Sequence, residues 1–495
     1  MNKLQIIAKN ESHVKTTENG ARAYDSLDSK LLTLFAEIGG LRNRSEADIE
    51  KMFEEAFNES SLLAMKLMFY AGDIREGLGE RRTFKICLKY LAKNYPEILF
   101  KNLHLIPFYN RFDTLFSLYG IDSLIDKVII QIIRNGIYFD LEAIKRDESI
   151  SLIGKWLPSE NASSAKTRAL ARKFMKELGY TPREYRKILS ILREYSDVIE
   201  RKMSNNDWDK IDYEKVPSRA MLKYREAFNK NDKERFKEYL RAVSDGEVKI
   251  NSSTLYPYDL VKSYIGYSYN PYKEENKVIE EQWKALPNYI EKESNILVMA
   301  DVSGSMYYGK PEPINSSIGL AIYFAERNKG PLENVYMTFT DRPHFQYINK
   351  EDSLLNKVNK VRLTDIGYNT NLEAAFDYLL NIAIKEDFSQ SDMPRAICVI
   401  SDMEIDSYKD DDSLDFVEAQ KEKYERAGYK LPKLILWNVE ARNDTFLSRS
   451  NDIIFVSGHS SSTFNYLIKA IDKDMNGFDV MLDVLNRNRY KCVRR

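Results

Sequence analysis

Three oxygen-bearing side chains follow an apolar run at alternate positions. The run I-L-V-M-A, residues 296–300, leads into D-V-S-G-S-M, which places Asp301, Ser303 and Ser305 in a tight loop that contains Gly304. Hard cations such as Mg²⁺ prefer oxygen ligands, and hydroxyls with one or two carboxylates supply them. Asp and Ser also favour turns and helix N-caps, which is the alternative interpretation. The spacing predicts a divalent-metal site.

Two further oxygen donors stand at comparable places later in the chain. Thr370, in G-Y-N-T-N-L, opens an expected helix after a loop, and Asp402 directly follows the apolar run A-I-C-V-I-S. Ligand sites of open α/β sheets lie at the carboxyl ends of the strands. We therefore expect Asp301, Ser303, Ser305, Thr370 and Asp402 to converge on one sheet edge and to bind Mg²⁺ or Mn²⁺.

The elements that must position these donors alternate between strand and helix from residue 295 onward. The expected strands, short runs rich in Val and Ile, are 295–300, 335–340, 396–401, 433–438 and 453–457. The expected helices between and after them are 314–328, 371–385, 412–427 and 462–471. This alternation predicts βαβ units in a doubly wound, mostly parallel sheet.

The first part of the chain is predicted to be helical from about residue 28 to residue 240. Ser45 is an expected N-cap, Gly179 an expected C-cap, and Thr181-Pro182-x-Glu184 an expected capping box. Helices of this length joined by short turns favour stacked antiparallel pairs, as in an α-solenoid. The fold class is therefore α + α/β, with a helical-repeat domain at 20–285 and an α/β domain at 290–495.

Composition supports a globular chain with two electrostatic regions. The 495 residues carry 74 basic and 75 acidic groups, and 43% are hydrophobic, values that exclude a disordered chain. The net charge of −1 combines +5 over residues 1–290 with −6 over 291–495. Residues 151–241 alone have 22 basic and 14 acidic groups, a surplus of +8.

The expected environment is a reducing, cytoplasmic one without membrane attachment. The three cysteines stand far apart, without a C-x-x-C pair, and indicate neither a disulfide framework nor a thiolate zinc site. No signal peptide opens the sequence, and no apolar run approaches the roughly 18 residues of a membrane span.

One helix in the basic region concentrates cations opposite its apolar face. The helix expected at about 163–178 carries five of them: Lys166, Arg168, Arg172, Lys173 and Lys176. Clustered Lys and Arg on one face indicate binding to a phosphate backbone. A solvated helix face is the usual alternative for such a charge run, and the residue pattern alone leaves both open.

A tyrosine-rich segment joins the two parts. Between about residues 242 and 290 it contains Tyr256, Tyr258, Tyr264, Tyr267, Tyr269 and Tyr272. Packing against a domain is the favoured interpretation because buried aromatic rings are common. Stacking of exposed rings on nucleic-acid bases is the alternative.

The chain lacks the patterns of common catalytic sites. Ser303 has no G-x-S-x-G elbow and no histidine nearby in sequence, and no Walker A loop or G-x-G-x-x-G is present. Metal-dependent nucleases usually have more acidic ligands than this constellation offers. We expect a protein that is not an enzyme.

The metal constellation resembles that of a known domain. D-V-S-G-S-M, the loop threonine and the S-D-M after a strand are similar to the metal-ion-dependent adhesion site of von Willebrand factor A domains. The resemblance implies Asp301, Ser303, Ser305, Thr370 and Asp402 as the site residues. It also implies an open metal position for an acidic group of a protein partner. The insertion Y-Y-G-K-P-E-P-I-N after Met306 departs from that pattern.

The helical part has a resemblance of its own. It resembles the TROVE domain of Ro ribonucleoprotein autoantigens, a ring of HEAT-like repeats joined to a von Willebrand A domain, and is closest to an uncharacterised TROVE-like domain-of-unknown-function branch. The matching segments are Phe69–Arg82, Lys155–Pro158 and Val216–Ala220. The resemblance implies binding of small noncoding or single-stranded RNA, with that role carried over to Lys166, Arg168, Arg172, Lys173 and Lys176.

Two functions are therefore expected as alternatives. The first is a Ro-like RNA-binding protein whose metal site recruits an acidic partner, and for which a monomer would suffice. The second is a metal-dependent interaction or assembly module without an RNA role. Within Phe69–Arg82 a structural role is favoured over RNA contact: Gly77 and Gly79 are expected to end one helix and Glu80 to start the next, which leaves Arg81 and Arg82 at a turn.

Overall fold

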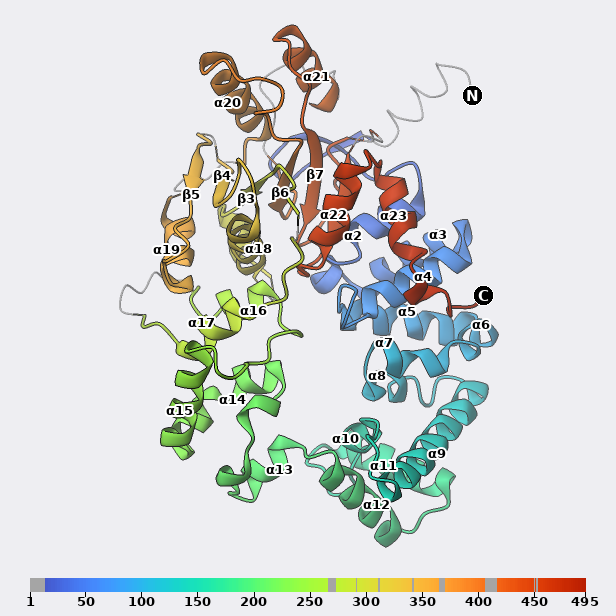
Figure 1. The fold of residues 1–495 in the computed structure, drawn as a ribbon. Helices are drawn as coiled ribbons and strands as arrows, with labels where there is room; N and C mark the ends of the chain where they lie inside the picture. Colours follow the sequence, from blue (N-terminus) through green and yellow to red (C-terminus); the bar gives the residue numbers. More distant parts are fainter. Residues whose placement is uncertain are drawn as a thin grey trace.

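The computed structural model describes most of the chain. The described residues are 14–265, 273–290, 292–309, 312–340, 342–364, 370–405, 416–448, 450 and 453–495. Figure 1 follows the chain from blue to red through these residues, and the six-stranded sheet lies in the upper half of that view.

A six-stranded sheet forms the centre of the α/β part. Its strands are β3 (Ile296–Ala300), β4 (Val335–Thr338), β5 (Phe345–Tyr347), β6 (Ala396–Ser401), β7 (Lys433–Asn438) and β8 (Ile454–Ser457). Their order is β5-β4-β3-β6-β7-β8. All neighbours pair in parallel except β4 and β5. The doubly wound, mostly parallel sheet is confirmed, as are the five expected strands. The edge strand β5 was not predicted, because three residues are too short for a periodic signal.

Helices cover both faces of this sheet. They are α18 (Pro313–Arg327), α19 (Leu354–Thr364), α20 (Leu372–Lys385), α21 (Phe416–Arg426), α22 (Thr463–Asp472) and α23 (Gly477–Leu485). All residues of β3 and β6 are buried, which explains why these strands are uninterrupted apolar runs rather than alternating ones. The four expected helices are present, and α19 and α23 are additional.

The preceding part is almost entirely helical after a short hairpin. Its first elements are β1 (Val14–Thr16), β2 (Arg22–Tyr24), α2 (Lys30–Glu37), α3 (Glu46–Glu59), α4 (Ser61–Gly72), α5 (Arg81–Asn94), α6 (Pro96–Phe100), α7 (Ile106–Tyr109), α8 (Phe112–Phe116) and α9 (Ser123–Lys145). The remaining helices are α10 (Ile153–Trp156), α11 (Ala165–Leu178), α12 (Pro182–Tyr195), α13 (Ile199–Ser204), α14 (Ser218–Asn231), α15 (Lys233–Ser244), α16 (Pro257–Val261) and α17 (Lys277–Lys284). In the described residues, no helix is both long and apolar enough to cross a bilayer.

The expected helix caps are present. The side chain of Ser45 accepts a hydrogen bond from Asp48 N. Thr181 and Glu184 form the reciprocal capping box at the start of α12, which satisfies two backbone donors at once. Gly179 ends α11 with φ +77°, a conformation that costs glycine little. These local signals therefore set the helix boundaries as predicted.

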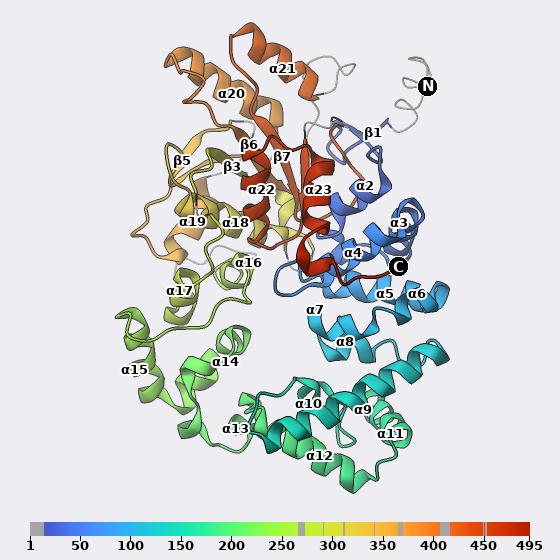
Figure 2. The same cartoon turned by 45° about the vertical axis from the view of Figure 1, so that its right-hand side comes forward.

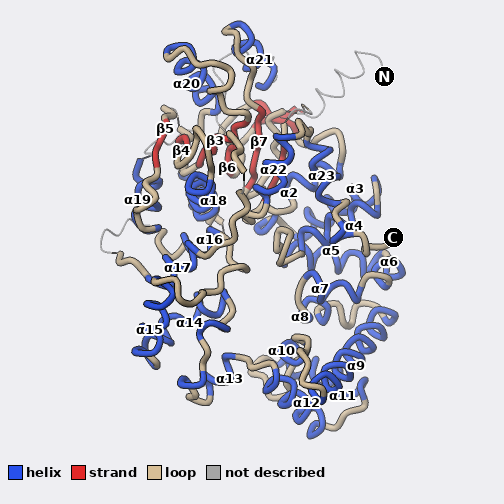
Figure 3. The backbone as a smooth tube through the Cα atoms, in the orientation of Figure 1, coloured by secondary structure: helices blue, strands red, loops and turns tan. Residues whose placement is uncertain are grey.

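The helical part forms a closed circuit with the sheet domain. In Figures 1 and 2 the chain descends from α2–α8 through α9–α12, crosses to α13, and returns through α14–α17 to the sheet. Figure 3 shows that the strands are gathered at one side of this circuit. The ends of the circuit close on the sheet because α2 packs against β8 and α16 packs against α18.

The two parts share one hydrophobic core. A single buried cluster extends from the N-terminal helices through the sheet to α23, and a smaller one lies around Ile211, Phe228 and Phe236. The C-terminal residues also pack on the helices, because Tyr490 Oη donates to Asp73 Oδ2 at 3.1 Å and Arg489 Nη2 donates to Asp73 Oδ1 at 2.8 Å. The sequence division between α17 and β3 is thus a change of architecture within one packed unit.

The described tyrosines of the tyrosine-rich segment pack against the rest of the protein. Tyr258 and Tyr264 are buried, and Tyr256 Oη donates to Leu78 O at 3.3 Å. The favoured packing interpretation is confirmed for these three rings. Tyr267, Tyr269 and Tyr272 lie outside the described residues.

The segment Phe69–Arg82 has a structural role. Gly79 adopts φ +67°, and the buried Glu80 carboxylate accepts two hydrogen bonds of 2.7 Å from Arg42. Arg82 Nη1 donates to Arg44 O at 2.8 Å. Glu80 starts α5 as its N-cap, as expected, whereas Arg81 and Arg82, expected at a turn, form the first turn of the helix. The expectation that Gly77 and Gly79 end a helix is wrong, because α4 ends at Gly72.

Candidate functional site

The candidate metal site lies where the strand order of the sheet reverses. From β3 the chain first builds outward through β4 and β5, and from β6 it builds the other way through β7 and β8. Asp301 and Asp402 follow the adjacent strands β3 and β6. Ligands of doubly wound sheets bind in the crevice at such a switch point, outside the carboxyl ends of the strands.

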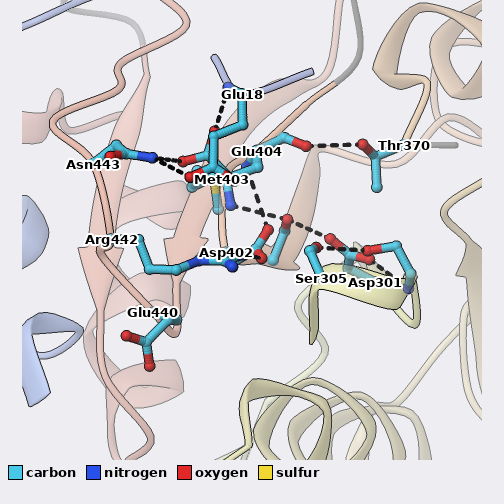
Figure 4. A network of polar contacts seen from close by, with 12 residues as sticks. Glu18, Asp301, Ser305, Thr370, Asp402, Met403, Glu404, Glu440, Arg442 and Asn443 are labelled. Atoms are coloured by element: carbon cyan, nitrogen blue, oxygen red, sulfur yellow. Dashed lines mark hydrogen bonds and ion pairs between the residues drawn. The ribbon is translucent and has the colours of Figure 1, made fainter. Parts of the chain in front are cut away.

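Asp301 is fixed by the loop that follows it and by the neighbouring strand. Its side chain is fully buried. Its Oδ1 accepts a hydrogen bond of 2.9 Å from Ser303 N, and its Oδ2 accepts one of 2.5 Å from Ser401 Oγ. Ser303 Oγ lies 3.1 Å from Ser305 Oγ. The D-x-S-x-S loop therefore brings its carboxylate and hydroxyls together (Figure 4).

Asp402 is held by the turn after β6. Asp402 is 1% exposed, and its Oδ1 accepts a hydrogen bond of 3.3 Å from Glu404 N. Met403 has φ +65°, a strained conformation for a residue with a side chain, and its N–H donates to Ser401 Oγ at 3.0 Å. The guanidinium of Arg442 forms an ion pair with Asp402 Oδ2.

Thr370 is placed at a different part of the same loop cluster. Its Oγ1 donates to Glu404 O at 3.1 Å, a contact drawn in Figure 4. The structure thus brings Asp301, Ser303, Ser305 and Asp402 together, and it places Thr370 against the turn that carries Asp402.

The electrostatics of the site favour an added cation. Burial, followed by repulsion from Asp402, raises the pKa of Asp301 to about 7. Burial raises the pKa of Glu440, which lies nearby, to about 7 as well. Two buried carboxylates side by side are costly unless a positive charge compensates them. Arg442 supplies one such charge.

The donor set fits a hard divalent ion. Asp301, Ser303, Ser305 and Asp402 offer only oxygen atoms, which suits Mg²⁺ or Mn²⁺ better than softer metals. The described residues contain no cluster of three or more His, Cys, Asp or Glu side chains that could hold a metal. Any ion here would therefore depend on hydroxyls and water as well as on the two carboxylates.

The N-terminal hairpin is fastened to the rim of this site. Glu18 N donates to Glu404 Oε2 at 2.7 Å, and Asn443 Nδ2 bridges Glu18 and Glu404 at 2.8 and 2.9 Å. Asn43 Nδ2 donates to the Glu440 carboxylate at 2.9 and 3.1 Å. Glu404 therefore links the turn after β6 to the N-terminal hairpin, and Asp406 lies outside the described residues.

A buried histidine lies beyond this site, after β8. His459 Nδ1 lies 2.5 Å from Ser316 Oγ in the first turn of α18, and the His459 ring packs 5.2 Å from that of Tyr258. Burial, assisted by the charge of Arg42, lowers the pKa of His459 well below 6.5. The histidine therefore joins α16, α18 and the N-terminal part at the point where the helical circuit closes.

We expect this histidine to destabilise the fold in acid. Because its folded pKa is lowered, the unfolded chain takes up the proton first as the pH falls below about 6.5, and stability is lost. The loss is about 1.4 kcal/mol per pH unit. In urea unfolding at pH 7.5 and pH 5, His459→Asn should reduce the difference between the two free energies by roughly 2 kcal/mol. An unchanged difference would contradict this prediction.

The cations of α11 lie on its outer face. Lys166, Arg172, Lys173 and Lys176 are exposed, and at 100° per residue they span an arc of about 120°. None of the four has an acidic partner in the described part of the chain. Arg168 differs, because its Nη1 donates to Ala162 O and Ser163 O at 2.7 Å and so stabilises the loop before the helix.

A second group of cations, which sequence reasoning missed, surrounds Asp113. Arg111 Nε donates to Asp113 Oδ1 at 2.8 Å, while Arg81 Nη2 and Lys85 Nζ lie 3.6 and 3.9 Å from Asp113 Oδ2. One carboxylate thus serves three cations. We call Arg81, Lys85 and Arg111 the Asp113 cluster.

The charges of the Asp113 cluster repel one another. Burial lowers the pKa of Arg81, and the positive charges of Arg111 and Arg219 lower it further. Burial also lowers the pKa of Lys85, with Arg81 and Arg111 among the contributing charges. Such an unbalanced, partly desolvated group is a candidate site for an anion.

Three sequence segments singled out above, Phe69–Arg82, Lys155–Pro158 and Val216–Ala220, contribute residues at or near this cluster. Arg81 comes from Phe69–Arg82, and Arg219 comes from Val216–Ala220. The Arg111 guanidinium stacks 3.9 Å from the ring of Trp156, which belongs to Lys155–Pro158. No local sequence pattern could predict that these residues come together, because they belong to four separate places in the chain: α5, the start of α8, α10 and α14.

Fold and site together define an α + α/β protein with an oxygen-rich site at the switch point of its sheet and two cationic surfaces on its helices. The chain belongs to the family described as Domain of unknown function (DUF2828), which matches residues 17–111 and 137–296. Residues 295–486 match a second family, described as Domain of unknown function (DUF7788). The two matches meet at the start of β3.

The chain is also similar to a viral protein. It is 27% identical over 513 residues to "Uncharacterized protein L728" of Acanthamoeba polyphaga mimivirus, covering 96% of this chain and 87% of that protein. No solved structure matches the chain.

Proposed function

We propose that this protein binds RNA through its helical circuit and carries a divalent-metal site that binds an acidic group of a protein partner. The observation that carries the proposal is the Asp113 cluster, in which Arg81, Lys85 and Arg111 compete for one carboxylate. A phosphate group would supply the missing negative charge. Arg and Lys are the side chains that bind phosphate backbones.

The exposed cations of α11 support the same proposal. Lys166, Arg172, Lys173 and Lys176 form a mainly cationic surface, with the exposed Glu177 of the same helix at its edge. Lys173 Nζ lies 5.9 Å from the centre of the Tyr119 ring. The likeness to TROVE proteins, which is part of this proposal, gives the ligand class as small structured or single-stranded RNA. The proposed function is binding without catalysis.

The metal part of the proposal rests on the buried pair Asp301 and Asp402. Together with Ser303 and Ser305 they would hold Mg²⁺ or Mn²⁺, with Thr370 in the loop beside them. A bound divalent ion there would supply a Lewis-acidic position for a carboxylate from a partner, as the likeness to von Willebrand factor A domains implies. Asp301 and Asp402 would orient the ion, and Ser401 would hold Asp301 in place.

Removing one α11 lysine should weaken RNA binding moderately. In fluorescence anisotropy with a labelled single-stranded RNA, we expect Lys176→Gln to lower affinity about fivefold at 0.1 M salt, with a shallower salt dependence, because one phosphate contact is lost. Lys421→Gln, an exposed lysine of α21, is the matched control. Equal affinities of the two variants would argue against α11 as an RNA-binding surface.

A metal-dependent interaction module without an RNA role is the second candidate function. It is favoured by the hairpin contacts of Glu18 and Asn443 with Glu404, which link the metal-site rim to the helical part. The same titration separates the two candidates. If the wild-type protein has no RNA affinity even at low salt, the RNA proposal fails and the second candidate stands.

A further inference from the structure

Arg442 occupies a position at the candidate metal site that no sequence pattern indicated. It follows β7, and its guanidinium pairs with Asp402 Oδ2 (Figure 4). The carboxylate of Asp402 is fully buried, whereas the Arg442 side chain is 25% exposed. A positive side chain of this protein therefore reaches from the solvent side to one of the two buried carboxylates.

The loop that carries Arg442 is held by the N-terminal part of the chain. Ala441 N donates to Gly40 O at 2.9 Å, and Arg44 Nη1 donates to Arg442 O at 2.8 Å. Arg44 also pairs with Asp444 at 2.6 Å. These contacts fix the backbone on both sides of Arg442, so that its side chain is presented to Asp402 from a stable support.

The guanidinium itself is held less firmly than its backbone. Only Nη2 contacts Asp402, whereas the strong arrangement for arginine and a carboxylate is a two-pronged fork. In the described part of the chain Nε of Arg442 is buried without a hydrogen-bond partner. A second carboxylate belongs to the same loop: Glu440 lies two residues before Arg442, and Figure 4 shows it beside the Arg442 side chain. The Arg442 side chain thus has a second carboxyl group, besides that of Asp402, towards which it can turn.

We propose that Arg442 is an internal cation that competes with the divalent metal for Asp402, and thereby sets the metal affinity of the site. This inference rests on the proposed metal site. Without the ion, Arg442 compensates the buried pair Asp301 and Asp402. When the ion binds, it repels the guanidinium, which moves from Asp402 towards Glu440 or solvent. Part of the binding free energy of the metal is spent on this displacement.

The proposed competition also affects the thermal stability of the protein. In the metal-free protein Arg442 stabilises two carboxylates that would otherwise repel each other without compensation, and removal of one partner of a buried ion pair is costly. Arg442→Gln should therefore lower the melting temperature in EDTA and enlarge the rise that Mg²⁺ produces. A role confined to holding the loop would lower the melting temperature equally with and without the ion.

Calorimetric titration of the full chain with MgCl₂ and with MnCl₂ tests the proposal. We expect Arg442→Gln to bind either ion about tenfold more tightly or better than wild type, because the single positive charge of Arg442 no longer repels the doubly charged ion across a partly buried site. Arg442→Lys keeps the charge on a shorter side chain, so its metal affinity should lie between those of wild type and Arg442→Gln. Arg395→Gln is the matched control, since Arg395 precedes β6 at the opposite end of the strand that leads to Asp402 and pairs with Asp472 at 2.8 Å.

Each outcome has a definite reading. Tighter binding by Arg442→Gln, with Arg395→Gln like wild type, supports the competition, as does binding by Arg442→Gln when wild type shows none. Equal or weaker binding by Arg442→Gln overturns the inference while the metal site itself stands. If neither wild type nor Arg442→Gln binds either ion, the proposed metal function fails, and the inference fails with it.

Discussion

Replacing Asp301 with asparagine is expected to abolish binding of Mg²⁺ and Mn²⁺. The carboxylate of Asp301 is fully buried and is oriented by Ser303 N and Ser401 Oγ, so it is the most firmly held carboxylate of the candidate site. Loss of a residue that only orients a ligand typically costs 10- to 100-fold in metal affinity, and loss of the ligand itself should exceed about 100-fold. Calorimetric titration of each variant with either ion measures the effect.

The fold should survive this substitution. The Asp301→Asn variant would leave Asp402 paired with Arg442, and it would remove the charge repulsion from Asp402 that helps to raise the pKa of Asp301. The metal-free variant should melt at least as high as wild type, which separates loss of a ligand from loss of structure. Asp474→Asn is the control, because that exposed carboxylate pairs with Lys433 at the amino end of β7. Retention of tight binding by the Asp301→Asn variant would refute the metal site.

Removing two cations of the Asp113 cluster is expected to weaken RNA binding strongly. Each phosphate contact of a single strand contributes about 0.7 to the slope of log affinity against log salt, or about fivefold at 0.1 M salt. The double variant Arg81→Gln with Lys85→Gln should therefore lose roughly 25-fold in affinity, with a slope about 1.4 shallower. Anisotropy titrations with a single-stranded RNA at several salt concentrations measure both quantities.

The design keeps the scaffold intact. Arg111 stays in place, so Asp113 retains its closest partner and Trp156 its stacked guanidinium. The control is Lys421→Gln with Lys430→Gln, two exposed lysines of the α/β part that remove the same charge elsewhere. If both double variants lose affinity equally, net charge rather than a site governs binding, and the Asp113 cluster is not the RNA contact.

Much of the fold follows from local patterns. The apolar runs of β3 and β6 predicted central buried strands, and Thr181, Pro182 and Glu184 predicted the start of α12. β5 and the β1–β2 hairpin were not predicted, since strands of three residues leave no periodic trace. The start of α5 at Glu80 was predicted, but Arg81 and Arg82 belong to the helix instead of lying at a turn.

The candidate site was predictable to the extent that its residues follow strands. Asp301, Ser303 and Ser305 come from one loop, and the rule that parallel strands end at one edge adds Asp402. The same rule could have singled out the residues after β7, where Glu440 and Arg442 lie. Their roles could not be predicted, however, because Glu440 is bound by Asn43 from the N-terminal part of the chain, and Arg442 pairs with Asp402 after a different strand.

The sequence by itself determined the classes of element, the sheet type and the oxygen-rich loop, because these depend on residue propensity, periodicity and spacing along a few tens of residues. Only the tertiary structure decided that the two electrostatic regions share one core, that Arg442 pairs with Asp402, and that Arg81, Lys85 and Arg111 share Asp113. Those contacts join residues from separate elements, and the energies of burial and charge that govern them arise only when the chain has closed.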